Sequence, residues 1–385
     1  MLLIRYWLKI VFLGILLFTV SLGIGAESWD NWGMTTYASP LEGLSAECGP
    51  LISYLPPGNA VTDGRTLLRN ALPIHDKEVR KLQADLEDIS EWLRSKRWGP
   101  IKRDISKVGR VLNTSRSKML EDVPPKNKAA AETLLDQFQV GLGTLREAVS
   151  AEDKEQTWSN RAALLKLVTE FEELMVEGFP FEIPQVYSHL PQLRGRATVE
   201  FETRQGTMTA IVDGFSAPIT AGNFVDLVQR GFYDGLEFTR AEDYYILQTG
   251  DPPGPETGFV DPKTGEYRTI PLEILVKGDS EPIYGETLEN LGRYLDDPVL
   301  PFSAFGTLGM AAPSNDVNGA SSQFFFFLFE PELTPAGLNL LDGRYAVFGY
   351  VIEGKEILNQ LTATDRILSA KVVSGLENLV QPTGV

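Results

Sequence analysis

The sequence predicts a protein of two folded parts, an all-α helical bundle followed by an α+β barrel. Apolar residues recur every three or four positions between residues 61 and 178, which is the spacing of one buried helix face. In residues 194–385 apolar and polar residues alternate along several runs, as they do in strands with one buried face. Residues 179–193 are interrupted by prolines and predict a linker between the two parts. A chain of 385 residues is long enough for two or three domains.

The composition is that of an acidic globular protein. Hydrophobic residues make up 43% of the chain, so a sizeable core can form, and the formal net charge is −17. That charge argues against nucleic acid and anionic membrane surfaces as partners. The single cysteine, Cys48, leaves no internal disulfide to form. The two histidines, His75 and His189, lie in different segments, so we expect no metal site, no Ser-His-Asp triad and no cofactor.

The N-terminus predicts an export signal. Arg5 and Lys9 precede an apolar run, residues 10–24, which is followed by small residues. A positive start, an apolar run of 15 residues and a small-residue exit are typical of a secretory signal peptide. We therefore interpret residues 1–26 as a cleaved signal peptide of an exported protein. The alternative of an uncleaved anchor stays open, although the run is short of the ~20 residues that span a membrane.

The helical part follows an irregular lead-in. Residues 27–60 are rich in Gly, Pro and Ser, and a short helix is expected over residues 62–72, before Pro73. Prolines or a short polar turn separate the longer apolar stripes that come next. These stripes lie at Val79 to Leu93, Ile101 to Met119, Leu135 to Val149 and Leu164 to Met175. Four amphipathic helices with short connections predict an antiparallel bundle.

The barrel part begins with a strand at Arg196. The turn at residues 205–206 leads into a second strand, residues 207–212. A helix is expected to start at Thr220, whose hydroxyl can cap it, and to end at Gly231. Later elements are a helix near residues 355–361 and a last strand over 367–373.

A single stretch, residues 238–251, carries the candidate chemistry. It reads FTRAEDYYILQTGD and places the guanidinium of Arg240 eight positions before the amide of Gln248. On one extended strand without a bulge, an even offset puts two side chains on the same face. An apolar face with two forked donors is suited to holding an uncharged peptide rather than to cutting it.

Four motifs together resemble the cyclophilins, the peptidyl-prolyl isomerases built on a closed eight-stranded β-barrel. They occur in the family's order over about the last half of the chain, at residues 217–238, 238–251, 308–329 and 340–351. The resemblance implies a multidomain fold, with an N-terminal all-α helical bundle followed by a cyclophilin-like closed eight-stranded β-barrel with flanking helices. The barrel domain would then occupy residues 194–385.

The resemblance also implies site residues. Arg240 matches the arginine that acts on the prolyl nitrogen, and Gln248 matches the glutamine that orients it and the substrate. A substrate pocket would be formed by Tyr245, Ile246, Met310, Ala311, Ala312, Gln323, Phe325, Leu340, Leu341 and Tyr345. Taken alone, Arg240 could instead be a surface arginine paired with Glu242 or Asp243.

The chain departs from the family's pattern at several positions. Tyr345 stands where the family has a pocket-edge histidine, and Leu340 stands where it has a tryptophan, which removes aromatic area and an N–H donor. The segment 252–301 is an additional excursion, and the loop before Gln323 is two residues longer than usual. These departures leave the rate and the substrate preference open.

The whole chain resembles the two-domain cyclophilins of the thylakoid lumen in cyanobacteria and chloroplasts. That group has a helical bundle ahead of the barrel and serves photosystem II assembly, often with weak isomerase activity. The resemblance implies a peptidyl-prolyl isomerase in the thylakoid lumen or periplasm, whose partners are proline-containing client segments, including lumenal loops of photosystem II subunits. The alternative is a non-catalytic chaperone or assembly factor that binds proline peptides and uses the bundle as a dock or lid. Client and oligomeric state stay open.

Overall fold

The computed structural model describes residues 61–242, 245–329 and 339–382, with the side chains of residues 240–242 left aside. All of these residues belong to one compact unit, residues 56–385. The predicted signal peptide and lead-in, residues 1–60, lie outside the described residues. None of the described helices combines the length and the apolar character that a membrane crossing requires.

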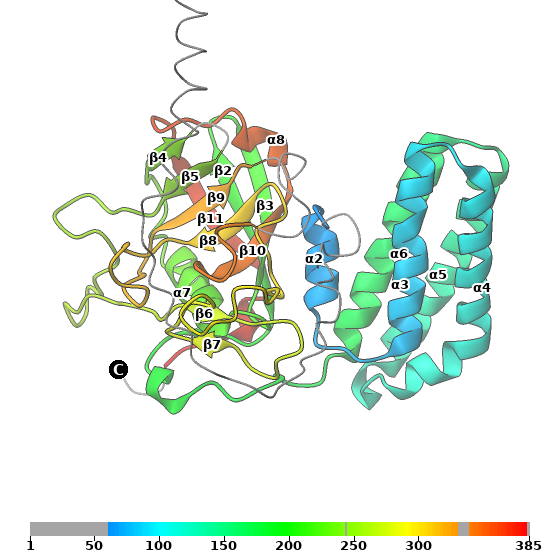
Figure 1. Cartoon of the computed structure of the whole chain (residues 1–385), viewed down its shortest axis with the longest axis horizontal. Coiled ribbons are helices and arrows are strands. Elements are labelled where there is room, and N and C mark those ends of the chain that lie inside the picture. The colour runs from blue at the N-terminus through cyan, green and yellow to red at the C-terminus, as the bar shows by residue number, and fades with distance from the viewer. Residues whose placement is uncertain (1–60, 243–244, 330–338, 383–385) are drawn as a thin grey trace, which may run out of the picture. The chain divides into compact units, whose positions relative to one another are not determined.

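The N-terminal part is an antiparallel helical bundle, as predicted (Figure 1). Its helices are α3 (Lys77–Arg94), α4 (Trp98–Glu121), α5 (Lys128–Ser150) and α6 (Lys154–Met175), with the 3-10 turn η1 (Pro125–Asn127) between α4 and α5. Consecutive helices pack on one another, and α6 also packs on α3. The predicted stripes form a single buried core. Asp76 and Asp153 begin α3 and α6 by accepting hydrogen bonds from the N–H groups of Val79 and Gln156.

The short predicted helix is α2 (Gly64–Ala71), and it connects the bundle with the barrel. Its apolar residues Leu67, Leu68 and Ala71 belong to a cluster with residues of the sheet. On the bundle side, the Arg69 guanidinium forms an ion pair with Glu87 of α3 at 3.0 Å. Helix α2 therefore has barrel contacts on its apolar face and bundle contacts through its polar groups.

The C-terminal part is built on an eight-stranded antiparallel sheet, in the order β11-β2-β3-β10-β8-β9-β5-β4. The strands are β2 (Arg196–Thr203), β3 (Gly206–Asp213), β4 (Phe238–Glu242), β5 (Ile246–Thr249), β8 (Thr307–Met310), β9 (Phe324–Phe327), β10 (Val347–Glu353) and β11 (Ile367–Ser374). The edge strands meet at one end, where Glu237 and Arg366 form a bridge and the Gly235 N–H donates to the Ile367 carbonyl at 2.7 Å. The sheet thus curls into the barrel that the resemblance implied.

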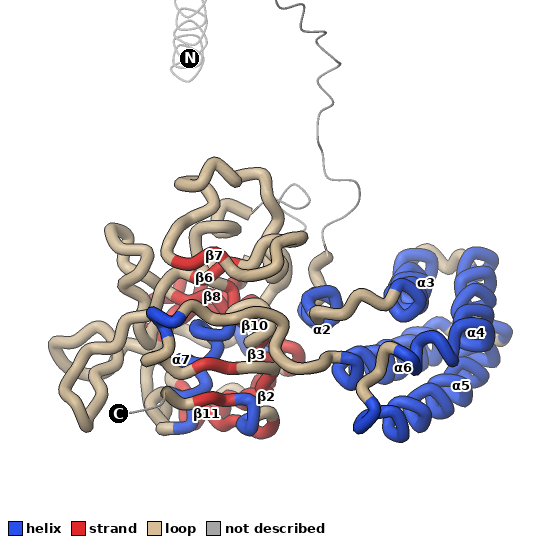
Figure 2. Tube along the Cα trace, turned by 90° about the horizontal axis from the view of Figure 1, so that it is seen from below, coloured by secondary structure: helices blue, strands red, loops and turns tan. Residues whose placement is uncertain are grey.

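Smaller elements complete the C-terminal part. Helices α7 (Pro218–Gln229) and α8 (Lys355–Leu358), the 3-10 turns η2 (Gln185–Tyr187) and η4 (Leu376–Asn378), and the strand pairs β1 (Gln192–Leu193) with β12 (Leu379–Val380) and β6 (Glu273–Ile274) with β7 (Ile283–Tyr284) lie around the sheet. Loops rather than regular elements surround β6 and β7 (Figure 2). This loop-rich region is the excursion that the sequence predicted over residues 252–301.

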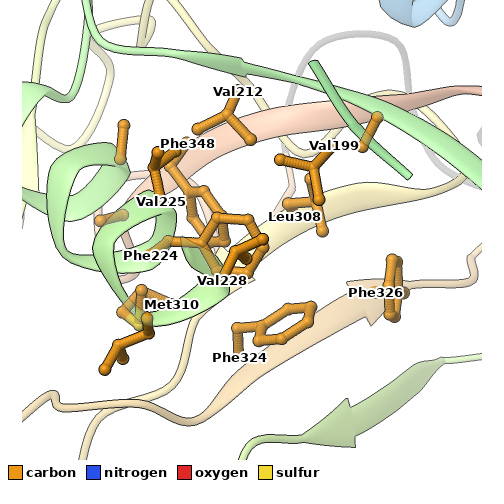
Figure 3. Packing of buried hydrophobic residues seen from close by; sticks show 14 of the residues in the cluster. Val199, Val212, Phe224, Val225, Val228, Leu308, Met310, Phe324, Phe326 and Phe348 are labelled. Atoms are coloured by element: carbon orange, nitrogen blue, oxygen red, sulfur yellow. The ribbon is translucent and has the colours of Figure 1, made fainter. Parts of the chain in front are cut away.

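The barrel interior is filled by apolar side chains that alternate along the strands. Phe324 and Phe326 of β9 point inward, where Phe324 packs edge-on against Phe224 of α7 at 5.1 Å between ring centroids (Figure 3). Phe325 and Phe327 belong instead to the cluster on the outer face. Since successive residues of a strand face opposite sides, the run of four phenylalanines supplies both faces of the sheet.

The start of helix α7 differs from the prediction. The helix begins at Pro218, two residues before Thr220, and the Thr220 hydroxyl makes no hydrogen bond. The buried carboxylate of Glu273 caps the helix instead, accepting hydrogen bonds from the N–H groups of Ile219 (3.1 Å) and Thr220 (2.9 Å). Proline is favoured at the first helical position, which places Thr220 inside the first turn rather than at the cap.

Candidate functional site

Strands β4 and β5 bring the two candidate polar residues to neighbouring positions. Arg240 and Gln248 are direct partners in the antiparallel register. The prediction of one extended strand from 240 to 248 is wrong, because the chain turns back between Glu242 and Ile246. The two positions share a face for another reason, which is that opposed residues of an antiparallel pair do so. The side chain of Arg240 lies outside the described part, so its role stays a prediction.

The row of register partners that begins with Arg240 and Gln248 continues across the next two strands. Gln248 is the register partner of Phe325 in β9, and Phe325 is the partner of Gly309 in β8. The Gln248 amide donates to the Gln323 side-chain oxygen at 2.7 Å, and the Gln323 amide donates to the Thr257 carbonyl at 2.7 Å. The half-buried Gln248 is therefore held in place from one side, beside an apolar ring.

Phe325 is the centre of the apolar part of the site. Its ring stacks on Phe302, with 5.8 Å between centroids and 6° between the ring planes. Tyr345 meets it edge-on at 5.7 Å. A Cβ atom on Gly309 would lie 2.5 Å from the tip of the Phe325 ring and 2.9 Å from Phe302. Only glycine at position 309 lets the two rings lie in this way, and sequence reasoning had singled out neither Gly309 nor Phe302.

Asp342 connects the segment that contains Leu341 and Tyr345 to the backbone of Phe302. One Asp342 carboxylate oxygen accepts a hydrogen bond from the Phe302 N–H at 2.7 Å, and the Asn339 amide donates to the Phe302 carbonyl at 3.1 Å. Burial raises the pKa of Asp342 to about 6, against the opposing effect of the N–H groups of Phe302 and Asn339. Both side chains thus fix the backbone of Phe302, a role that the sequence analysis did not assign to Asp342.

Most predicted pocket residues lie together on the outer face of the sheet. One cluster contains Ile246 and Phe325, with Tyr245, Ala311, Leu341 and Tyr345 packed against it. Leu340 is 81% exposed and lies outside this cluster. Ala312 packs against the interior cluster.

The position of the Met310 side chain differs from the prediction. Its side chain is buried in the barrel interior near α7 (Figure 3), and its register partner is the inward-facing Phe324. The prediction that it lines the same hollow as Phe325 is therefore wrong. The reason is parity along β8, in which Gly309 occupies the outward position and its neighbour must face inward.

Helix α2 shares the cluster that contains the site. Leu67, Leu68 and Ala71 are buried in the same cluster as Phe325 and Phe302. Val61 lies just before the helix, and its carbonyl accepts a hydrogen bond from the Ser303 hydroxyl at 2.7 Å. A segment from the N-terminal half of the chain therefore packs on the barrel face that carries the site.

The described residues hold no group of three His, Cys, Asp or Glu side chains that could bind a metal ion. The arrangement instead offers an apolar floor, an oriented amide and a register position for a guanidinium. These groups can hold a peptide and stabilise a changed geometry of its backbone, and none of them is placed to attack a carbonyl.

Comparison with known proteins agrees with this arrangement. Residues 63–176 match the family described as the peptidyl-prolyl cis-trans isomerase CYP38-like, PsbQ-like domain, and residues 198–376 match the cyclophilin-type peptidyl-prolyl cis-trans isomerases. A Synechocystis protein, named as a thylakoid lumen peptidyl-prolyl cis-trans isomerase, is 55% identical over 345 residues, which are 90% of this chain and 91% of the relative.

Two proteins of Arabidopsis thaliana are also similar over most of the chain. The chloroplastic isomerase CYP38 is 41% identical, covering 87% of this chain and 79% of its own, and the chloroplastic isomerase CYP37 is 33% identical, covering 89% and 77%. Both parts of the chain, and their order, are thus shared with these relatives. The chain belongs to the cyclophilin-type peptidyl-prolyl cis-trans isomerases, in the group that carries a CYP38-like helical domain ahead of the isomerase domain.

Proposed function

We propose that this protein isomerises X-Pro bonds of exported client proteins at the outer face of its barrel, with Arg240 and Gln248 as the polar groups. The observation that supports this most is the row of register partners that joins position 240 to Gln248 and Phe325. It brings the position of a guanidinium, an amide and an apolar ring onto neighbouring strands.

The reaction needs little from the enzyme beyond this set. Rotation about an X-Pro bond is opposed by a barrier of ~20 kcal/mol, because amide resonance must be broken. As the bond twists, the prolyl nitrogen becomes pyramidal and can accept a hydrogen bond. A guanidinium N–H aimed at that nitrogen stabilises mainly the twisted state and so speeds the reaction. Each factor of ten requires about 1.4 kcal/mol.

The other residues would bind and orient the client. The half-buried residues Ala311, Leu341 and Tyr345 pack against the cluster of Phe325, so they offer apolar contacts to a proline ring. Gln248, fixed by Gln323, would hold the neighbouring peptide group and the guanidinium of Arg240. A binding pocket usually consists of an apolar surface with a few oriented polar groups.

The names of the relatives support a location. They are named as thylakoid lumen or chloroplast proteins. We therefore propose that the clients are lumenal proteins, and that they include lumenal loops of photosystem II subunits during assembly.

A second function is favoured by helix α2 and by two substitutions. Leu67 and Leu68 pack in the cluster of Phe325, while Leu340 and Tyr345 replace residues that the family uses in its pocket. In this alternative the protein binds proline-containing segments without catalysis, as a chaperone or assembly factor, and the bundle with α2 acts as a dock or lid.

Exchange NMR on a proline peptide, with the full chain, separates the two functions. Replacing Arg240 by Ala should lower the isomerisation rate by about 100-fold, which is the usual effect of losing one donor that acts in the transition state. The control is Arg204→Ala, which removes an exposed arginine from the turn between β2 and β3 and should leave the rate unchanged. If the native chain binds the peptide but is no faster than Arg240→Ala, the enzymatic proposal fails and the binding function stands.

A further inference from the structure

The excursion carries an exposed apolar patch. Leu291 is 46% exposed, Tyr294 is 69% exposed and Leu295 is 72% exposed. The three side chains fall within five residues of one another in the segment 286–297. We call them the outer patch. Large apolar side chains that are exposed close together in the sequence are candidates for an interaction site.

The backbone of the outer patch is firmly folded. The Arg293 guanidinium binds Asp279 at 2.7 and 3.1 Å and Asp296 at 2.6 Å. The Gly292 N–H donates to the Glu289 carbonyl at 3.0 Å, and the Arg293 N–H donates to the Leu288 carbonyl at 2.7 Å. These bonds show that the patch side chains are presented by an ordered turn.

The outer patch is attached to the wall of the candidate site. The Leu288 N–H donates to the Gly343 carbonyl at 3.0 Å, and Arg344 forms an ion pair with Glu289 at 2.7 Å. A Cβ atom on Gly343 would lie 2.8 Å from the buried Leu288 side chain. Gly343 lies between Leu341 and Tyr345, so one piece of backbone carries both the site wall and the root of the patch.

We propose that Leu291, Tyr294 and Leu295 bind large apolar side chains of the client that lie a few residues from its proline. This inference rests on the proposed function, because it takes the site at Phe325 as the position of the proline. The patch would make the protein selective for apolar client segments, such as those exposed before assembly, over short or polar proline peptides.

An extended client can reach both places. Gly343 is two residues from Tyr345, and its carbonyl accepts a hydrogen bond from the Leu288 N–H. The Leu288 carbonyl in turn accepts a hydrogen bond from the N–H of Arg293, the residue before Tyr294. These short backbone steps add up to about 20 Å at most. An extended chain covers that distance in about six residues, at roughly 3.3 Å each.

The charges around the patch favour such a client over an anionic membrane surface. The segment 286–297 carries Glu286, Glu289, Asp296 and Asp297 against the single cation Arg293. Anionic lipid headgroups would be repelled by this net negative charge, whereas neutral or basic client segments would not. Continuity with the site wall favours the client over a second copy of the chain.

Three peptides test the inference on the full chain. The first is a four-residue peptide, Ala-Ala-Pro-Ala, that reaches only the proline site. The second places that core in a longer peptide with Leu and Phe on both sides, and the third has Ser at those positions. Titration by NMR should show that the native chain binds the apolar peptide about tenfold more tightly than the serine peptide, a factor in the range expected from burying one or two apolar side chains.

Substitution of the patch should remove that preference. In the triple variant Leu291→Ser, Tyr294→Ser, Leu295→Ser the two longer peptides should bind equally. The matched control replaces Val140 and Val186, which are 73% and 68% exposed, by Ser, and it should keep the tenfold preference. A thermal melt shows whether each variant is folded.

The outcomes separate this inference from the proposed function. If the triple variant keeps the tenfold preference, the outer patch does not bind the client. If the native chain is a dimer by sedimentation and the triple variant is a monomer, the patch is an interface between copies, which also overturns the inference. If instead Phe325 does not mark the proline site, Ala-Ala-Pro-Ala gives no shifts at Phe325; if only the catalytic proposal is wrong, the peptide binds there but Arg240→Ala leaves the isomerisation rate unchanged. Both results are independent of how the patch variant behaves.

Discussion

The two faces of strand β9 differ in how they are built. On the inner face, Phe324 packs against Phe201 of β2, Phe224 of α7 and Phe348 of β10. On the outer face, Phe325 packs against Phe302 and Tyr345, which come from loops. The inner face is therefore made by the regular fold, whereas the outer face depends on loops and on α2. If the proposed function is right, the difference predicts that stability resides mainly inside the barrel and recognition outside it.

The largest expected effect comes from exchanging one phenylalanine on each face. Phe324→Ala should lower the free energy of unfolding by about 4 kcal/mol, because it opens a cavity in a closed aromatic core. Phe325→Ala should cost less stability, since the neighbouring Tyr345 and Leu341 are half-buried and can adjust, but it should abolish binding of a proline peptide. Urea unfolding and NMR titration measure the two quantities. Equal losses of stability and binding in both variants would show that the faces are not specialised.

A smaller effect is expected from Gly309→Ala on the outer face. The new Cβ would lie 2.5 Å from the Phe325 ring, so the ring must move from its stack on Phe302. We expect a loss of about 1–3 kcal/mol in stability, as for other overpacked sites, together with weaker peptide binding. The control is Gly143→Ala in α5, where a Cβ meets nothing within 4 Å and helix propensity should add about 1 kcal/mol of stability. Unchanged peptide affinity in Gly309→Ala would contradict the importance of the stack.

The smallest effect concerns the pH dependence that Asp342 gives the outer face. Burial raises its pKa to about 6 in the folded state, against about 3.9 in an unfolded chain. The folded state therefore holds the proton more tightly, and the stability from Asp342 is full below pH ~4 and is lost as pH rises through ~6.

The variant Asp342→Asn isolates this contribution. The difference in unfolding free energy between the native chain and the variant should shift against the native chain by about 2 kcal/mol between pH 4 and pH 7. Denaturant unfolding at several pH values measures it. A difference that does not change with pH would show that Asp342 stays ionised throughout and does not make the stability of the turn that holds Phe302 depend on pH.

The elements that depend on local sequence were predicted well. The bundle helices α3 to α6 follow from apolar stripes, because a helix contacts its surroundings with the same period along its whole length. Strands β2 and β3 follow in the same way from the alternation after Arg196. Sequence motifs also identified Gln248, Phe325 and Tyr345, which the structure brings to one face of the sheet.

The failures share a different cause, which is that they depend on register and on distant contacts. Whether Gly309 or Met310 faces outward is decided by pairing with β9, and a one-residue shift exchanges the two faces. The cap of α7 comes from Glu273, more than fifty residues later in the chain. The stacking of Phe302 on Phe325 and the packing of α2 on the barrel join segments that no local pattern connects.

The capping of α7 by Glu273 has a consequence for engineering this protein. Glu273 sits in the segment 252–301, interpreted from the sequence as an insertion, yet it satisfies the first N–H groups of the helix that closes the barrel interior. Trimming the insertion to obtain a minimal barrel would leave those N–H groups without an acceptor in an apolar environment. The insertion is thus an integral part of the scaffold, and a shortened version would need a new acceptor at Ala217 before it could fold well.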